Sequence, residues 1–128
     1  MNLKTYSKLA KRTLSPIDGV LLNVVHMLLG MSTELGELQD QYKKYIAYGK
    51  QLDLINVQEE VGDLMWYIIN LCTMLDFDLE KILDQNIAKL KTRYPEKFTE
   101  HQALNRNLDD EHKVLTGYSQ MSLTTEPE

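Results

Sequence analysis

Apolar residues recur along this chain at intervals of three and four, the spacing that places them on one face of an α-helix. This pattern predicts a short amphipathic helix near residues 3–10 and a long helix from about Pro16 to Tyr48. Ser15 is the expected N-cap of the long helix, because proline is favoured in the first helical position. Gly49 is expected to end the helix in the left-handed conformation.

Two more helices are expected downstream. A second long helix covers about residues 53–75, and a third covers about residues 76–94, with Asp76 or Asp78 as its cap. Pro95 cannot continue the third helix, because it lacks a backbone N–H and its ring clashes with the preceding turn. Alternating runs typical of strands are few, so the pattern predicts an all-α protein.

The length of 128 residues suits one domain, since domains of roughly 100–150 residues are common. We expect this domain to cover residues 1–115. Residues 116–128 have few apolar side chains and are expected to form a disordered tail. Hydrophobic residues make up 43% of the chain and charged residues 26%, a balance that excludes a wholly disordered or fibrous protein.

Each long helix presents an apolar face about 120° wide, which we call its core arc. In the first long helix the core arc consists of Val20, Val24, Met27, Leu28, Met31, Leu35, Leu38, Tyr42 and Ile46. In the second it consists of Val57, Val61, Leu64, Met65, Ile68, Leu71, Cys72 and Leu75. The two arcs predict an antiparallel helical hairpin in which they face each other.

A second apolar stripe lies roughly opposite each core arc. It consists of Leu22, Val25 and Leu29 on the first long helix and of Trp66 and Ile69 on the second. One hairpin cannot bury both sides, so we expect a homodimer that completes a core like that of a four-helix bundle, with a tetramer as the next choice. The alternative within one chain is that the N-terminal and third helices cover part of this surface.

Two short motifs place carboxylates on the long helices: ELGE at residues 34–37 and EVGD at residues 60–63. In each helix the second acid lies on the same shoulder of the core arc, so both pairs face one side of an antiparallel hairpin. The motifs are also equally far in sequence from the predicted turn at residues 48–49, which makes them level. Four carboxylates are therefore expected to converge halfway along the hairpin. They are Glu34, Glu37, Glu60 and Asp63.

Converging carboxylates raise one another's pKa values unless a cation neutralises them. Oxygen ligands without histidine or cysteine favour Mg²⁺, with Mn²⁺ as an alternative. The motifs are otherwise explained as solvated surface acids, because like charges on an exposed helix cost only about 0.2–0.5 kcal/mol. The matching shoulder and height of the two pairs favour the metal site.

The third helix has a polar edge of Asn86, Lys89 and Arg93 beside its apolar face. Such an edge is often only solvated. Next to a metal site, however, it becomes a candidate clamp for phosphate oxygens, which accept hydrogen bonds from basic side chains.

The ordered set of motifs resembles the MazG-like family of all-α nucleoside triphosphate pyrophosphohydrolases, whose signature is ExxE, a spacer and ExxD. Here the motifs stand in GMSTELGELQD and QEEVGDLMWYI. The downstream segment NIAKLKTRYPEKF is similar to the family's N-x-x-K-x-x-x-R-aromatic segment, so the resemblance extends from about His26 to Phe98. The single domain and its C-terminal part resemble short phage-type and bacterial members.

The resemblance implies Mg²⁺-dependent hydrolysis of a (deoxy)nucleoside triphosphate, (d)NTP, at the α-phosphorus, giving a nucleoside monophosphate and pyrophosphate. It implies that the four carboxylates hold Mg²⁺ and that the edge of the third helix contacts the phosphates. Either Glu34 or Glu37 would position the attacking water. The preferred nucleotide is left open.

Two further side chains lie near the motifs. Tyr67, one turn beyond Asp63, is a candidate phosphate contact or a half-buried core tyrosine. His26, two turns before Glu34 on the same shoulder, is a candidate base or ribose contact or a structural histidine.

Charge and cysteine content narrow the partners and the compartment. The net charge of −5 argues against a nucleic-acid-binding surface, which needs a basic footprint. No apolar run approaches the ~20 residues of a membrane span, so no membrane partner is expected. The single cysteine, Cys72, lies in an apolar run and suggests a packed thiol in the cytoplasm.

Two other classes of function were weighed. A di-iron carboxylate bundle needs Glu-x-x-His motifs, and none of the three histidines has a glutamate three residues before it. A non-catalytic helical interaction module with a solvated acidic face is the remaining alternative, and it predicts no metal-dependent turnover.

Overall fold

The structure is a computed structural model that describes the backbone of residues 1–121 and the side chains of residues 1–117. Over this part of the chain it is helical without a strand, which confirms the predicted all-α class. The elements in chain order are α1 (Leu3–Ala10), the 3-10 helix η1 (Lys11–Thr13), α2 (Val20–Tyr48), α3 (Leu54–Met74), α4 (Leu79–Arg93), α5 (Glu100–Leu104) and α6 (Leu108–Met121).

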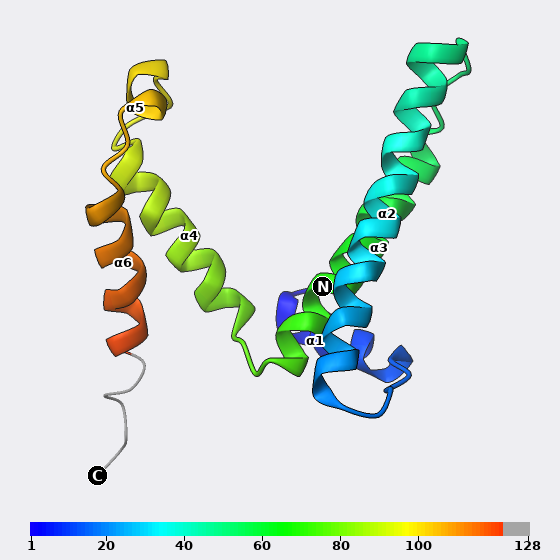
Figure 1. The fold of residues 1–128 in the computed structure, drawn as a ribbon, viewed down its shortest axis with the longest axis horizontal. Coiled ribbons are helices and arrows are strands. Elements are labelled where there is room, and N and C mark those ends of the chain that lie inside the picture. Colours follow the sequence, from blue (N-terminus) through cyan, green and yellow to red (C-terminus); the bar gives the residue numbers. More distant parts are fainter. Residues whose placement is uncertain (122–128) are drawn as a thin grey trace. The chain divides into compact units, whose positions relative to one another are not determined.

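The contacts between helices divide the chain into two compact units, Met1–Asp78 and Leu79–Glu128, where we expected one domain. In the first unit α2 packs on α3, and α1 packs on α3 and η1. In the second unit α4 packs on α6. Figure 1 shows α2 and α3 as two long neighbouring helices, the predicted hairpin. Completion of a larger bundle by a second copy stays a proposal.

The start of α2 differs from the prediction. The helix begins at Val20, after Gly19 with φ 97°, so Ser15 is not its N-cap. The Asn23 side chain explains the later start, because it bonds residues that precede the helix. Its amide nitrogen donates to the carbonyls of Ile17 and Gly19 at 2.5 and 2.7 Å, and its oxygen accepts from the Ile17 N–H at 2.9 Å. These bonds hold residues 17–19 in a turn against the first turn of α2.

The turn of the hairpin agrees with the prediction. Gly49 ends α2 with φ 61°, and its N–H bonds the carbonyl of Lys44. Only glycine adopts this left-handed conformation without a steric cost. Asp53 begins α3 as its N-cap, because its carboxylate accepts from the N–H groups of Ile55 and Asn56 at 3.0 and 3.1 Å. These two caps fix where α2 ends and where α3 begins. They therefore keep the two acidic motifs at the same distance from the turn.

The core of the first unit lies away from the turn. Met27 of α2 and Cys72 of α3 are buried members of the core arcs, and burial raises the pKa of the Cys72 thiol. Towards the turn the hairpin is exposed, and Ile55 is 82% accessible. Several residues of the predicted core arcs are exposed as well, namely Val20, Leu28, Leu35, Tyr42, Ile46, Val61 and Leu75. Their burial in the single chain was predicted wrongly, because two helices in contact cover only part of each other's apolar face.

The apolar stripe opposite the core arc is covered on one long helix and exposed on the other. On α3 it is covered within the chain, since α1 packs there and Ile69 is only 2% accessible. Trp66 of the same stripe donates from Nε1 to Thr13 Oγ1 of η1 at 2.8 Å. On α2 the stripe is exposed, and Leu29 is 62% accessible. The N-terminal helix therefore provides the intrachain cover that we considered, but only for α3.

The second unit contains two helices that the pattern did not predict, α5 and α6. Thr99 caps α5 through a bond from the Gln102 N–H at 3.2 Å, and Asn107 accepts from the Asp110 N–H at 3.1 Å in the first turn of α6. Helix α6 continues to Met121, beyond the tail boundary expected at residue 116. Residues 122–128 of the predicted tail lie outside the described residues.

Glu111 of α6 is the buried charge of the second unit, 4% accessible. Its carboxylate accepts two hydrogen bonds from Arg93 of α4 at 2.8 and 2.7 Å and a third, from Arg106, at 2.7 Å. This arrangement satisfies a buried carboxylate with two guanidinium groups, and it joins α4 to α6. No helix among residues 1–121 has the length and apolar character that crossing a membrane requires.

Candidate functional site

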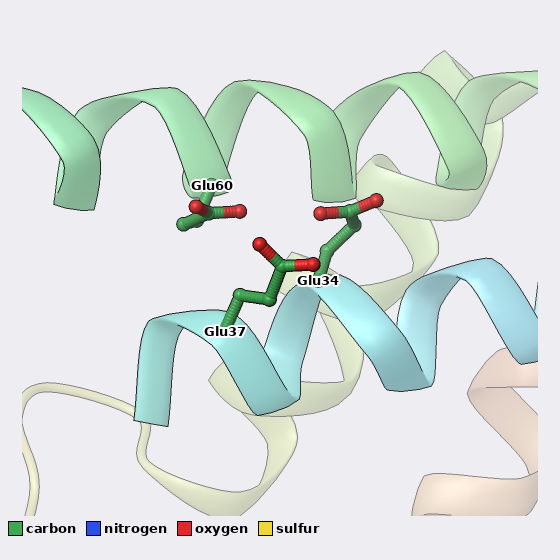
Figure 2. A group of neighbouring side chains, drawn as sticks. All are labelled: Glu34, Glu37 and Glu60. Atoms are coloured by element: carbon green, nitrogen blue, oxygen red, sulfur yellow. The ribbon is translucent and has the colours of Figure 1, made fainter. Parts of the chain in front are cut away.

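Three of the four predicted carboxylates meet between α2 and α3. Glu34, Glu37 and Glu60 each offer one oxygen that lies within 4.8 Å of the other two. Figure 2 shows Glu34 and Glu37 on one helix and Glu60 on the other, with their side chains directed toward the space between the helices. The fourth acid, Asp63, is outside this group. It is exposed and lies beside Glu34 in the lining of a neighbouring pocket.

The three acids differ in their environment. Glu60 is 4% accessible and accepts a hydrogen bond from Asn56 Nδ2 at 3.0 Å, whereas Glu34 is half-buried and Glu37 is exposed. Burial raises the pKa of Glu34, and a side-chain hydrogen bond to Glu60 and the charges of Asp63, Glu37 and Glu60 raise it further. Asn56 was not predicted to take part. Its position one turn before Glu60 is the signal that could have identified it, because residues four apart on a helix are neighbours.

This donor set fits a divalent cation. The three clustered side chains supply only carboxylate oxygens, which are the ligands preferred by Mg²⁺ and Mn²⁺. Burial and the neighbouring acids together raise the pKa of Glu34, and a bound cation would favour its charged form. The neighbouring Asp40 is a contrasting case. Hydrogen bonds from Lys43 and Lys44 lower its pKa to about 2, so its charge is already compensated.

A pocket of about 370 Å³ adjoins the carboxylates on one side. It is lined by Thr13 of η1, Glu34 of α2 and Asp63, Trp66 and Tyr67 of α3. Of these, Thr13 and Trp66 were not predicted as site residues. Trp66 was assigned to the apolar stripe, and nothing in the local pattern around Thr13 indicates that η1 folds back onto α3.

A second groove, of about 410 Å³, runs along α2. It is lined by Thr33, Gly36, Glu37, Asp40, Gln41 and Lys44, and so it combines acidic, amide and basic side chains. The clustered acids therefore border two hollows, because Glu34 lines the pocket with Trp66 and Tyr67 and Glu37 lines the polar groove.

Tyr67 is held in place by its neighbours. Its ring packs so closely on Gly30 of α2 that a Cβ at residue 30 would lie 2.0 Å from the ring carbon Cε1. The ring is edge-on to Trp66 at a centroid distance of 4.9 Å and to His26 at 6.3 Å. His26 Nδ1 is buried and has no hydrogen-bond partner among the described residues. Tyr67 therefore lines the pocket together with Glu34, and His26 lies against the Tyr67 ring, while their contacts with a substrate stay predictions.

The predicted phosphate clamp belongs to the second unit. Asn86 is exposed and Lys89 is half-buried on α4. The Arg93 guanidinium is bound by Glu111, and this hydrogen-bonded pair holds the pKa of Arg93 above its usual range and that of Glu111 below it. Arg93 also lies 5.8 Å from the centre of the Tyr94 ring. Contact of these three side chains with phosphate stays a prediction.

Comparison with known proteins gives one family and one curated relative. Residues 23–98 match the MazG nucleotide pyrophosphohydrolase domain, a segment that includes all four carboxylates and the edge of α4. The chain is also similar to the gene 37 protein of Mycobacterium phage L5, with 31% identity over 72 residues. That alignment covers 53% of this chain and 63% of the phage protein, which is less than two thirds of the relative's length. No solved structure matches the chain.

Proposed function

Because the chain belongs to the MazG nucleotide pyrophosphohydrolase family, we propose that it hydrolyses a (deoxy)nucleoside triphosphate to the monophosphate and pyrophosphate with Mg²⁺. The convergence of Glu34, Glu37 and Glu60 is the observation that supports this proposal most strongly. The three acids lie within the matched segment, on two helices, and offer oxygens close enough to share a cation.

The four carboxylates have unequal roles in this proposal. Glu34, Glu37 and Glu60 hold the cation, and Asp63 completes its ligands from the next turn of α3. Asn56 keeps Glu60 in position through its 3.0 Å hydrogen bond. When bound, Mg²⁺ supplies positive charge that compensates the triphosphate and the developing charge of the reaction, and Mn²⁺ can replace it.

The reaction itself is a displacement at the α-phosphorus. The oxygen of a water molecule forms a bond to this phosphorus while the bond to the bridging oxygen breaks, so pyrophosphate leaves with that oxygen. Glu34 or Glu37 orients the water and accepts its proton, which then passes to solvent.

The remaining predicted residues bind the substrate. Asn86, Lys89 and Arg93 donate hydrogen bonds to phosphate oxygens, and Tyr67 adds a further donor. Arg93 is held for this contact by Glu111, which accepts hydrogen bonds from its Nε and from one terminal nitrogen. His26 contacts the base or the ribose. We further propose a homodimer, or a tetramer, that covers the exposed stripe of Leu22, Val25 and Leu29, and action in the cytoplasm.

The test is an assay of purified protein with a panel of (d)NTPs and Mg²⁺ that measures pyrophosphate and orthophosphate separately. We expect pyrophosphate and monophosphate in equal amounts. Orthophosphate as the only product excludes the proposed reaction, and the absence of turnover supports the non-catalytic interaction module.

A pair of variants tests the site. Glu60→Gln removes the most buried carboxylate and is expected to lower kcat by about a hundredfold or more, the scale of losing a group that stabilises transition-state charge. Glu80→Gln is the control, because Glu80 is exposed on α4 and lies outside the acidic cluster. It should keep activity close to wild type. A fully active Glu60→Gln protein with a normal melting curve would remove Glu60 from the site.

A further inference from the structure

The pocket beside Glu34 and Asp63 has walls of two chemical kinds. One wall consists of these two carboxylates, and the other consists of Thr13, Trp66 and Tyr67. In the proposed function the acids and their cation take the phosphates. Apart from the Tyr67 hydroxyl, which the proposed function directs at a phosphate oxygen, the aromatic wall offers phosphate little, because a ring face is electron-rich and repels an anion. It suits a neutral aromatic group that is joined to the phosphates.

The aromatic wall is held rigidly from several sides. Trp66 donates from Nε1 to Thr13 Oγ1 at 2.8 Å, and its carbonyl accepts from Asn70 Nδ2 at 3.0 Å. Tyr67 is fixed by its close packing on Gly30 and is nearly perpendicular to Trp66, at 86°. A wall whose side chains are already ordered binds a ring without a large entropic cost.

Thr13 supplies a polar group in the same pocket. Its hydroxyl donates its only hydrogen to the Ala10 carbonyl at 2.9 Å and accepts the Trp66 N–H. A hydroxyl accepts two hydrogen bonds, so one acceptor site remains. A ligand group that donates an N–H or O–H satisfies this site. Nucleobases and sugars provide such donors beside an aromatic or neutral surface.

We propose that this pocket binds the nucleoside part of the substrate, with Trp66 and Thr13 as residues that determine which base is accepted. The inference rests on the proposed function, because it assumes that the triphosphate of the substrate binds at the cation site. The volume of about 370 Å³ is within the range of small-molecule sites, roughly 300–1,000 Å³. The pocket also explains why the base preference is not evident from the family motifs, since Thr13 lies outside the matched residues 23–98.

The experiment uses the full chain with Mg²⁺ and two kinds of probe. α,β-Methylene nucleoside triphosphates resist hydrolysis at the proposed bond and carry a base, whereas inorganic tripolyphosphate carries none. Calorimetry measures the Kd of each probe. Because Trp66 is the only tryptophan of the chain, its fluorescence emission reports on this pocket alone. We expect nucleotide analogues to change the emission and bound tripolyphosphate to leave it nearly unchanged.

Variants test the specificity. Trp66→Leu and Thr13→Val are expected to weaken nucleotide binding about tenfold, the scale of losing a base stack or a good hydrogen bond. Tripolyphosphate binding should stay within about twofold of wild type. Thr13→Ser keeps the hydroxyl and should bind as wild type does. Thr5→Val is the control, because Thr5 is exposed on α1 and does not line the pocket.

The outcomes separate the two proposals. If nucleotides bind and the Thr13 and Trp66 variants bind them like wild type, the pocket assignment is wrong and the proposed function stands. An equal emission change with tripolyphosphate also overturns the assignment. Should neither probe bind in the presence of Mg²⁺, the proposed function fails and the nucleoside pocket fails with it. The Thr13 variants keep the test decisive if Trp66→Leu does not fold.

Discussion

Glu34 of α2 and Glu60 of α3 face each other across the hairpin, and each offers a carboxylate oxygen that lies within 4.8 Å of the other. Burial raises the pKa of Glu34, and the neighbouring Glu60 raises it further. A cation bound between the two carboxylates would compensate the charge of both.

Mg²⁺ should stabilise the folded chain. A cation that binds only the folded arrangement adds about 2.7 kcal/mol to the free energy of unfolding at a hundred times its Kd. Thermal melts with Mg²⁺ and with NaCl of matched ionic strength measure this effect. Glu34→Gln should show a smaller Mg²⁺-induced rise. Equal melting temperatures of wild type in the two salts would mean that the acids do not form a specific cation site, since screening alone acts the same in both.

The metal-free protein should lose stability from Glu34 as the pH rises. A carboxyl group whose pKa is raised by folding binds its proton more tightly in the folded state, so its stabilising contribution is complete below the ordinary value of 4.5 and declines as the pH rises through the raised pKa. Glu34→Gln does not titrate. We therefore measure the free energy of unfolding of both proteins with a chelator present. The value for Glu34→Gln minus the value for wild type should increase as the pH rises above 4.5. A difference that does not change with pH would contradict the raised pKa.

Gly30→Ala should destabilise the hairpin. The new methyl group would lie 2.0 Å from the Tyr67 ring, so the ring must move away from Gly30. We expect a cost of about 1–3 kcal/mol from overpacking, measured by denaturant unfolding. Gly36→Ala is the matched control on the same helix, because nothing lies within 4 Å of its added Cβ. Its free energy of unfolding should rise by about 0.5–1 kcal/mol, because alanine has a higher helix propensity than glycine. Similar effects of the two substitutions would argue against the Tyr67 contact.

Glu111→Gln should lower the stability of the second unit at neutral pH. The Arg93 and Arg106 hydrogen bonds hold the pKa of Glu111 below its ordinary value, so its contribution to stability is present above the ordinary value and is lost as the pH falls through the lowered pKa. We expect the variant to melt several degrees lower at neutral pH, with the difference shrinking in acid. Asp109→Asn is the control, because Asp109 is an exposed acid in the same first turn of α6 and should contribute little to stability.

The exposed stripe of Leu22, Val25 and Leu29 should mediate association. Contiguous apolar surface on a helix is normally covered by another element or another copy. Light scattering at micromolar concentration is expected to give a multiple of the chain mass of 14.9 kDa. Leu29→Lys, at a residue 62% accessible in the single chain, should lower that mass without unfolding the protein. A wild-type mass of one chain would refute the proposed oligomer.

The sequence predicted the helices whose signals are local. Helix α3 begins at the N-cap Asp53 and α2 ends at the left-handed Gly49, because a cap and a positive φ depend on neighbouring residues. The start of α2 was predicted wrongly. Ser15 and Pro16 form a good local start signal, but the Asn23 side chain bonds residues 17–19 and the helix begins after them. Helices α5 and α6 were missed because α5 has only five residues and α6 packs on α4, a contact that is not local in sequence.

The spacing of the two acidic motifs by itself predicted that carboxylates of both helices would meet, because helical periodicity and equal distance from the turn leave little freedom in an antiparallel hairpin. Glu34, Glu37 and Glu60 do so, whereas Asp63, predicted by the same spacing, lies outside the group in the lining of the neighbouring pocket. Only the tertiary structure decided the rest of the site. It placed Thr13 against Trp66, residues 53 positions apart, and it bound Arg93 to Glu111 across two helices. Such contacts depend on where separate helices pack, and no local periodicity contains that information. The cluster of acids therefore follows from the chain alone, whereas the walls of the pocket follow from the fold.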